Sequence, residues 1–239
     1  MRRTDMPWIL RSLLVALPVA AIACGQPEAT RSLAAVESAA PERAAAPSAV
    51  AARPRIVFLG DSLTAGLGLP REQSVPSLIQ ARLDAEGYGY EVVNAGVSGD
   101  TSAGGLRRLD WALEGDVDVL VVELGANDGL RGLPVTQMKR NLSEIVGGAV
   151  ARGVIVILTG MEAPPNYGPQ YTSEFRRAFR EVADEHDALF VPFFLEGVAG
   201  VAALNGGDGI HPNAEGARVI ERTIWRALEP VLARGARDR

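Results

Sequence analysis

From residue 53 onward, short apolar runs alternate with longer stretches of helical spacing. The runs are rich in Val, Ile and Leu and show little polar alternation, which is typical of strands covered on both faces. Strands that alternate with helices predict a parallel sheet with helices on both faces. The sequence therefore indicates one α/β domain of three layers, with five strands. We expect these strands at residues 56–60, 91–94, 117–124, 154–159 and 189–192.

Two helices are clear from the spacing of their apolar positions, which recur every three or four residues. In the first, Gly153 follows the periodic stretch and is expected to end the helix. In the second, which is the last of the chain, Asn213 is expected to cap the start. The expected buried faces are Val135, Met138, Leu142, Ile145, Val146, Ala149 and Val150 in the first helix, and Ile220, Ile224, Leu228 and Val231 in the second.

Glycine and short polar residues gather where the expected strands end. In an open parallel sheet, ligands bind at the carboxyl ends of the strands. The segments concerned are 60–63, 94–101, 125–129 and 160–168, together with the turn at 208–213 before the last helix. Because these ends share one edge of the sheet, we expect a site there.

The N-terminal residues have the layout of a secretory signal. Arginines precede an apolar run at 13–23, which is too short for a membrane span. The run ends in Ala21-Ile22-Ala23-Cys24-Gly25, which resembles a bacterial lipoprotein box, with Cys24 as the lipidated residue. Ala21 and Ala23 also satisfy the small-residue rule for ordinary signal cleavage at the same bond, which is the alternative to lipidation. We expect an exported, periplasmic protein that is membrane-anchored if Cys24 is lipidated.

Residues 24–52 are mostly Ala, Pro, Glu, Ser and Arg and include no aromatic residue. Such a segment cannot bury enough apolar surface to offset its chain entropy. We therefore expect a disordered tether between the signal at 1–23 and the domain at 53–239. A short alanine-rich helix is the alternative.

Net charge and the counts of cysteine and histidine exclude several kinds of partner and of catalytic or metal site. A net charge of −5 and scattered basic residues give no reason to expect a nucleic-acid partner. The single cysteine, Cys24, excludes an internal disulfide and any zinc site built on several thiolates. An imidazole base must be His186 or His211, the only two histidines. His186 lies between two acidic residues at an expected helix end, and we interpret it as a solvated surface residue.

Ser62 stands where the first expected strand turns. A serine hydroxyl is a weak nucleophile without an adjacent base. His211 can take its proton, because an imidazole that titrates near neutrality works in both directions. Asp208, three residues earlier, can hold the other imidazole nitrogen. Candidate donors to a tetrahedral oxyanion are the backbone N–H groups of Ser62 and Gly99 and the side-chain amide of Asn127.

Four motifs carry a resemblance to a known family. They are Gly60-Asp61-Ser62-Leu63, Ser98-Gly99-Asp100-Thr101, Gly125-Ala126-Asn127-Asp128 and Asp208-Gly209-Ile210-His211-Pro212. In this order they resemble the four sequence blocks of the SGNH (GDSL) hydrolases. The resemblance runs from about residue 53 to 233, and within the family it is closest to bacterial periplasmic hydrolases of the thioesterase, lysophospholipase and arylesterase type. One departure is Ala126, where such relatives have glycine.

The resemblance implies a flavodoxin-like fold, no metal and no organic cofactor. It assigns Ser62, Asp208 and His211 to the catalytic triad, and Ser62, Gly99 and Asn127 to the oxyanion hole. Segment 161–171 is too long and proline-rich for a tight connection, so we expect a flap over the acyl chain, with an inert surface loop as the alternative. Further residues expected to touch the substrate are Asp61, Leu63, Gly129, Leu130, Pro165, Asn166, Tyr167 and Ile210. We expect Asp61 also to bond local backbone and Asp128 to be structural.

The sequence therefore predicts an exported serine esterase acting on carboxylic esters or thioesters with medium acyl chains. Lysophospholipids and aryl or alkyl esters are expected as substrates before acyl-CoA, and a monomer is expected. One alternative is a carbohydrate O-acetylesterase, which would need a polar sugar-binding surface near the site. Another is a catalytically inactive lipoprotein used for binding, which would have no need for Ser62, Asp208 and His211 together.

Overall fold

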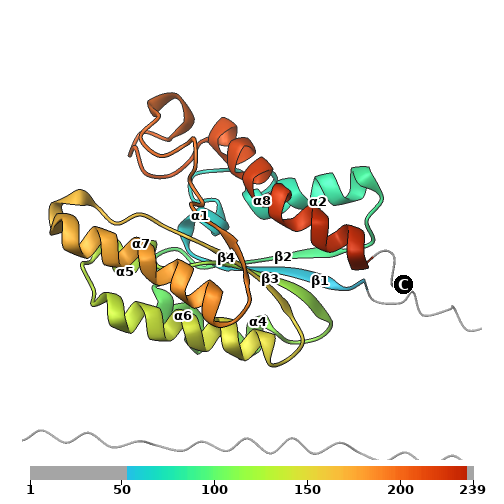
Figure 1. Cartoon of the computed structure of the whole chain (residues 1–239). Helices are drawn as coiled ribbons and strands as arrows, with labels where there is room; N and C mark the ends of the chain where they lie inside the picture. Colours follow the sequence, from blue (N-terminus) through green and yellow to red (C-terminus); the bar gives the residue numbers. More distant parts are fainter. Residues whose placement is uncertain (1–52, 236–239) are drawn as a thin grey trace, which may run out of the picture. The chain divides into compact units, whose positions relative to one another are not determined.

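The computed structural model describes residues 53–235. The expectations for the signal segment, the tether and Cys24 fall on residues 1–52 and so lie outside the described residues. The sheet consists of β1 (Arg55–Gly60), β2 (Glu91–Gly96), β3 (Val117–Glu123), β4 (Ile155–Thr159) and β5 (Leu189–Val191). All neighbouring pairs are parallel, in the order β2-β1-β3-β4-β5 (Figure 1).

That strand order is the flavodoxin-like one, and it confirms the predicted five-stranded parallel sheet. Strand boundaries differ from the predicted ones by no more than two residues. Within the described residues the helices are α1 (Ser62–Ala65), α2 (Val75–Glu86), α3 (Ser102–Arg107), α4 (Leu109–Ala112), α5 (Ala126–Leu130), α6 (Val135–Val150), α7 (Gly168–Glu185) and α8 (Ala214–Gly235), with 3₁₀ turns at Arg71–Gln73, Pro165–Tyr167 and Ala202–Leu204.

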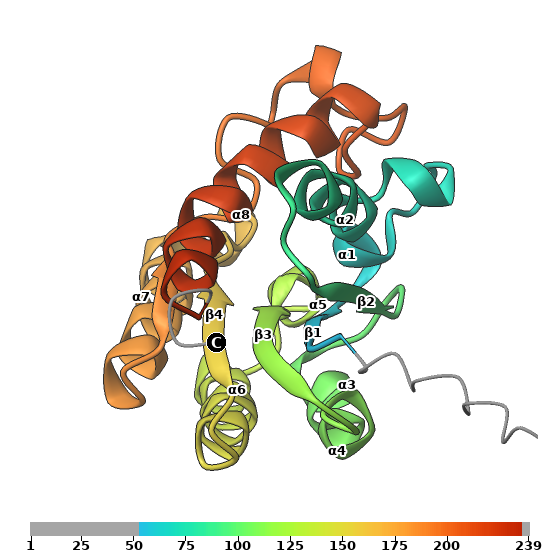
Figure 2. The ribbon, with the colours of Figure 1, turned by 90° about the vertical axis from the view of Figure 1, so that its right-hand side faces the viewer.

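Helices cover both faces of the sheet. Helices α2 and α8 pack together on one face, and α3, α4, α6 and α7 lie over the other (Figures 1 and 2). Most apolar side chains of the central strands β1 and β3 consequently have almost no exposure, as their largely apolar sequences predict. No helix in the described part of the chain is both long and apolar enough to cross a membrane.

Helix α6 shows how far the spacing argument holds. Met138, Leu142 and Ala149 are fully buried, but Val150 is 41% exposed, so its predicted place on the buried face is wrong. One residue rotates the helix by about 100°, which turns Val150 away from the core that Ala149 meets. Gly153, at a positive φ of 78°, then allows the chain to leave the helix as predicted.

Helix α8 begins as the sequence predicts. The side-chain oxygen of Asn213 accepts hydrogen bonds from the backbone N–H groups of Glu215 (3.0 Å) and Gly216 (3.1 Å). Two of the otherwise unpaired N–H groups of the first turn are thereby satisfied. The cap also fixes where the chain leaves the turn that carries His211.

His186 differs from its interpretation as a solvated surface residue. Its ring is partly buried, with Nε2 2.8 Å from Ser143 Oγ on α6. The ring also lies against Gly147, where an added Cβ would come within 2.8 Å of the imidazole. His186 therefore joins the end of α7 to α6. It lies just before β5 begins, at the amino edge of the sheet and not at the carboxyl edge that carries Ser62.

Candidate active site

Ser62 is held at a sharp turn after β1. Gly60 ends the strand where no other residue fits, because an added Cβ would lie 2.0 Å from Thr64 Oγ1 and 2.8 Å from Glu123 Oε2. The Asp61 carboxylate accepts a hydrogen bond from Leu63 N–H (3.0 Å), which caps the short helix α1. As expected, Asp61 thus bonds local backbone. The turn fixes Ser62 at the carboxyl edge of the sheet.

Ser62, His211 and Asp208 form one hydrogen-bonded chain. Ser62 Oγ lies 3.0 Å from His211 Nε2, and His211 Nδ1 lies 2.6 Å from Asp208 Oδ2. The bond to His211, helped by the backbone N–H groups of Ile210 and His211, holds the pKa of Asp208 well below its usual range. An ionised carboxylate only accepts, so Nδ1 carries the proton in this pair. Nε2 of a neutral imidazole is then left to accept from the Ser62 hydroxyl.

The loop that carries His211 is fixed by its own backbone. Gly206 N–H donates to the His211 carbonyl (2.7 Å), and Gly209 N–H donates to the Gly206 carbonyl (3.0 Å). Gly209 has a positive φ of 70°, which a glycine adopts without strain. The loop brings His211 to a serine 149 positions earlier in the chain.

The three predicted oxyanion donors line the same cavity as His211. Gly99 has a φ of 84°, in the region that favours glycine. The Asn127 amide donates one hydrogen to Asp61 Oδ2 at 2.9 Å, which orients it and leaves its second amide hydrogen for a ligand. The backbone N–H of Ser62, as the first of its helix, has no acceptor within that helix. The arrangement can stabilise negative charge beside Ser62 Oγ.

The cavity has a volume of about 620 Å³. Most of its wall is apolar, and its larger apolar side chains are Leu63, Leu67, Leu130, Met161, Leu195 and Ile210. The wall as a whole draws on the loops that follow all five strands, with Ser98 and Gly99 coming from the loop after β2. The space suits a flexible apolar chain next to the hydroxyl of Ser62.

The structure separates the residues predicted to touch the substrate into two groups. Asp61, Leu63, Leu130, Pro165 and Ile210 line the cavity. The other three do not, and they are Gly129, Asn166 and Tyr167.

Their neighbours explain why two of these three lie outside the wall. Gly129 packs under the ring of Phe175, which an added Cβ would meet at 2.9 Å. The Tyr167 hydroxyl donates to the Leu130 carbonyl (2.9 Å), so this ring lies beside the cavity. Asp128 accepts from the N–H (2.7 Å) and hydroxyl (2.6 Å) of Ser102, consistent with a structural residue.

Segment 161–171, which we expected to form a flap, contributes only its first half to the wall of the cavity. Residues 161–165 line the cavity, and both Met161 and Ala163 are buried. The rest of the segment is the 3₁₀ turn Pro165–Tyr167 and the start of α7. Movement of this segment over an acyl chain stays a prediction.

Comparison with known proteins places this geometry in a family. The model of the "GDSL-like Lipase/Acylhydrolase family" matches residues 58–219, which include every segment that carries the site. The chain belongs to this family. The resemblance read from four short motifs is thereby confirmed.

Individual proteins that are similar to this chain agree with its assignment to the family. "Esterase TesA" of Pseudomonas aeruginosa is 46% identical over 183 residues, which cover 76% of this chain and 91% of that protein. "Thioesterase 1/protease 1/lysophospholipase L1" of Escherichia coli K12 is 34% identical over 76% of this chain and 86% of that protein. The crystal structure of the psychrotrophic esterase EstA from Pseudoalteromonas sp., inhibited by monoethylphosphonate, is 37% identical with a TM-score of 0.71, covering 75% of this chain and 98% of that one.

Arg108, which the sequence did not single out, ties two site segments of this GDSL-like protein together. Its Nη2 donates to the Gly60 carbonyl (2.8 Å), its Nη1 to the Ala95 carbonyl (2.6 Å) and its Nε to Asp100 Oδ2 (2.7 Å). The first bond holds the strand end before Ser62, and the last holds the residue after Gly99. Nothing in the sequence marks this arginine, because charged residues on helices usually face solvent.

Glu123 lies completely buried beneath the Ser62 turn. Its Oε2 accepts from Thr64 Oγ1 (2.8 Å) and from Asp61 N–H (3.2 Å), while its Oε1 has no donor among the described residues. Burial, followed by the nearby Asp61 charge, raises the pKa of Glu123 well above its usual value. Burial also raises the pKa of Asp61, but hydrogen bonds from Leu63 and Asn127 oppose this effect. We therefore take Glu123 as the protonated member of the pair.

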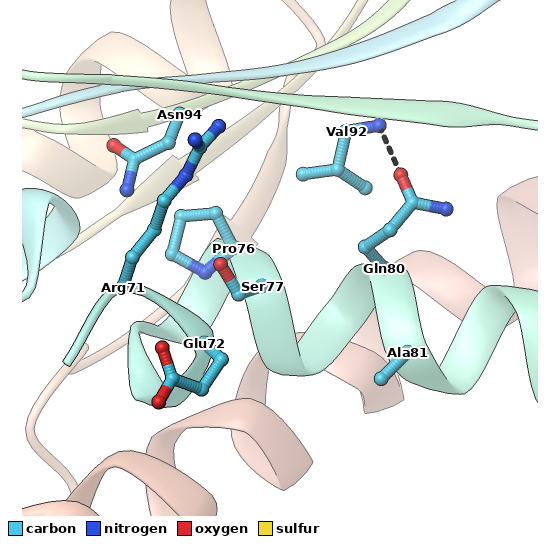
Figure 3. Close-up of a pocket in the computed structure, with 8 residues that line it drawn as sticks. All are labelled: Arg71, Glu72, Pro76, Ser77, Gln80, Ala81, Val92 and Asn94. Atoms are coloured by element: carbon cyan, nitrogen blue, oxygen red, sulfur yellow. Dashed lines mark hydrogen bonds between the residues drawn. The ribbon is translucent and has the colours of Figure 1, made fainter.

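A second groove runs between α2 and the edge strand β2, and it has no comparable chemistry (Figure 3). Its volume is about 380 Å³. Gln80 reaches across it to accept from Val92 N–H at 2.6 Å. Asn94 donates to the Thr64 carbonyl (3.1 Å) and accepts from Gly96 N–H (3.0 Å). Gln80 thus joins α2 to β2, and Asn94 joins β2 to α1, so both amides are already used within the fold.

The part of the chain that the structure describes holds no group of three His, Cys, Asp or Glu side chains placed to bind a metal ion. Chemistry without a metal or an organic cofactor remains the expectation from the family resemblance.

Proposed function

We propose that this protein is a serine esterase that hydrolyses carboxylic esters or thioesters through an acyl-enzyme on Ser62. The observation that supports this most directly is the hydrogen-bonded chain from Ser62 through His211 to Asp208 at the wall of an apolar cavity. A hydroxyl, an oriented imidazole and an ionised carboxylate are the groups that acyl transfer needs.

In the first half-reaction, Ser62 Oγ attacks the carbonyl carbon while its proton passes to His211 Nε2. Asp208 stabilises the imidazolium that forms. Ser62 N–H, Gly99 N–H and the Asn127 amide donate to the oxyanion. His211 then gives its proton to the leaving alcohol or thiol, and the bond to that group breaks. In the second half-reaction, water attacks the acyl-enzyme with His211 again as base, which releases the acid and restores Ser62.

The cavity favours a substrate with an apolar acyl chain of medium length. Its wall is mainly aliphatic, and its exposed acidic residue, Glu162, is paired with Arg176 at 2.5 Å. The names of the relatives, an esterase and a thioesterase/lysophospholipase, support small ester and thioester substrates. The signal-like N-terminus supports an exported, periplasmic protein, with lipidation at Cys24 as its anchor. We take the chain to act as a monomer.

The same wall weighs against a carbohydrate O-acetylesterase, because a sugar needs several convergent polar side chains. It does not weigh against a catalytically inactive binding protein. That alternative is disfavoured by the bonding of His211 to both Ser62 and Asp208, which binding alone does not require.

A series of p-nitrophenyl esters, acyl thioesters and acetylated sugars, assayed with the purified protein, tests the proposal. We expect kcat/KM for the esters to rise with acyl length from acetyl to medium chains, since each buried methylene adds about 0.8 kcal/mol, or roughly fourfold. Preference for acetylated sugars over all longer acyl esters would favour the O-acetylesterase instead. No turnover of any substrate would favour a binding protein.

Replacing Asn127 with alanine should lower kcat by about 10² to 10³-fold with a smaller change in KM, because the lost donor acts mainly on the oxyanion. Steady-state kinetics with a medium-chain ester measure both constants. Asn166→Ala is the matched control, since it removes the same atoms from a residue outside the cavity wall. Equal kinetics for the two variants would remove Asn127 from the oxyanion hole.

A further inference from the structure

Large exposed hydrophobic side chains are concentrated around the mouth of the cavity. The described residues include ten of them, and three lie elsewhere: Trp111, Val150 and Ile155. The other seven, which we call the apolar rim, are Leu67, Val97, Leu130, Leu133, Tyr167, Val201 and Ile210. Exposed hydrophobic residues that gather on one part of a protein surface often mark an interaction site.

The rim is continuous with the cavity. Leu67, Leu130 and Ile210 line the cavity and yet are 48%, 48% and 50% exposed, so each side chain has one side in the cavity and one in solvent. Val97 and Val201 each stand next to a residue of the cavity wall, Ser98 and Gly200 respectively. An apolar path therefore leads from the outer surface to the space beside Ser62.

Hydrogen bonds hold the rim in place. The Tyr167 hydroxyl donates to the Leu130 carbonyl (2.9 Å), and the Tyr171 hydroxyl donates to the Leu133 carbonyl (2.8 Å). Leu133 N–H donates in turn to the Asp128 carbonyl (3.0 Å). The apolar side chains are thus exposed by a fixed backbone, and local rearrangement alone would not bury them.

The three remaining exposed hydrophobic residues lie at the opposite end of the sheet. Ile155 is the first residue of β4, and Val150 is the last residue of α6, which leads into that strand. Trp111 lies in α4, whose neighbour Asp110 pairs with Arg152 in the same region. The amino edge of the sheet therefore offers a matched set of exposed apolar residues at the end of the sheet away from Ser62.

We propose that the apolar rim seats this protein on a phospholipid surface, so that an acyl chain passes from the lipid into the cavity without crossing water. The inference rests on the proposed function, since it concerns the source of the substrate. Arg131 lies between Leu130 and Leu133 in the chain and is exposed. Its Nη2 donates to the Gly99 carbonyl (2.9 Å), and the described residues place no carboxylate in an ion pair with it, so its charge stays unneutralised beside the cavity. Its charge would face the phosphates of a lipid surface.

The segment between Cys24 and the domain is long enough for a lipid on Cys24 and the apolar rim to reach the same membrane. The rim lies at the carboxyl edge of the sheet, whereas β1 enters from the amino edge. Residues 24–52 number 29, and a chain of this length spans at most about 100 Å. A six-residue strand such as β1 is only about 20 Å long. A lipid on Cys24 would therefore not prevent the rim from facing the same membrane.

The test compares two triple variants of the full chain, each carrying Cys24→Ser so that no acyl anchor contributes. Val97→Ser/Leu133→Ser/Val201→Ser changes rim residues outside the cavity wall, and Trp111→Ser/Val150→Ser/Ile155→Ser is the matched control. Two quantities are measured with phosphatidylcholine vesicles that contain a minority of phosphatidylglycerol: the partition of protein onto them, and kcat/KM for a long-chain lysophospholipid embedded in them. Hydrolysis of dissolved p-nitrophenyl acetate reports an intact site.

We expect the rim variant to lose about tenfold in partition and in kcat/KM on embedded lipid, with unchanged hydrolysis of the dissolved ester. The control variant should match the parent, which is the chain that carries Cys24→Ser alone. Equal behaviour of the two triple variants would overturn the proposal. So would sedimentation showing that the parent is a dimer and the rim variant a monomer, since the rim would then bind a second copy. If the proposed function alone is wrong, the parent and both triple variants will show no ester hydrolysis, but the rim variant will still partition less onto vesicles than the control variant.

Discussion

Alanine in place of Ser62 is expected to lower kcat for ester hydrolysis by about 10⁴-fold or more while the protein stays folded. The change removes the attacking oxygen and leaves His211, Asp208 and the oxyanion donors in place. The lost hydrogen bond is one partly buried contact of 3.0 Å, so we expect a loss of only about 1 kcal/mol in unfolding free energy. Kinetics with a p-nitrophenyl ester and a thermal melt measure the two effects.

Ser173→Ala provides the matched control, because it removes the same oxygen from an exposed residue of α7. A phosphonate ester offers a second readout. It should add one phosphonyl group to the parent and to the control, and none to the Ser62 variant, as seen by intact mass. If the Ser62 variant keeps activity close to that of the control, or is still labelled, the nucleophile is another residue.

The predicted site residues that the structure brings together could be picked out from the sequence for one shared physical reason. Ser62, Gly99, Asn127 and His211 each lie in a short Gly-rich turn at a strand end or before the last helix. Local chemistry largely decides such turns, as the positive φ of Gly99 and the Asp61 cap of α1 illustrate. Parallel strands with right-handed crossovers then bring these turns to one edge. Motif order and topology together were enough to predict the constellation.

Residues whose place depends on packing at a distance could not be predicted. Leu67 and Leu195 line the cavity because long loops fold back over the sheet edge, and neither lies in a recognisable motif. Arg108 contacts Gly60, 48 positions earlier, through an orientation that no local pattern reports. His186 packs on α6 in the same way. Spacing predicts which face of an element is buried, but not what that face meets.

Glu123 is an intermediate case, because the sequence carries a signal for its burial but not for its contacts. A carboxylic acid inside the otherwise apolar run 117–124 is costly to bury unless it is neutral or paired. In the structure it supports the Ser62 turn through Thr64 and the Asp61 backbone. Asp61 in turn orients Asn127. The buried acid is thus linked to Asn127, the proposed oxyanion donor, through Asp61, which makes Glu123 a positioning group in that proposal.

Substitutions of Glu123 should therefore separate its charge from its hydrogen bonding. Glu123→Gln keeps an acceptor for Thr64 and Asp61 and is uncharged, so we expect it to change the free energy of unfolding by less than about 1 kcal/mol below about pH 4.3, where Glu123 is protonated in the folded and the unfolded chain alike. Glu123→Ala leaves both donors unpaired around a cavity and should cost about 2 to 4 kcal/mol. Denaturant titrations of the parent and both variants measure these differences. The alanine variant should also lose activity, because the Ser62 turn loses its support.

The raised pKa of Glu123 fixes the sign of the pH dependence. Above about pH 4.3 the unfolded chain releases this proton while the folded protein keeps it, so the parent loses stability as pH rises towards the folded pKa. The glutamine variant has no such proton. Its stability relative to the parent should therefore increase with pH, by at most about 1.4 kcal/mol per unit. If the free energy of unfolding of the parent instead increases relative to that of the glutamine variant as pH rises, Glu123 is ionised in the folded protein.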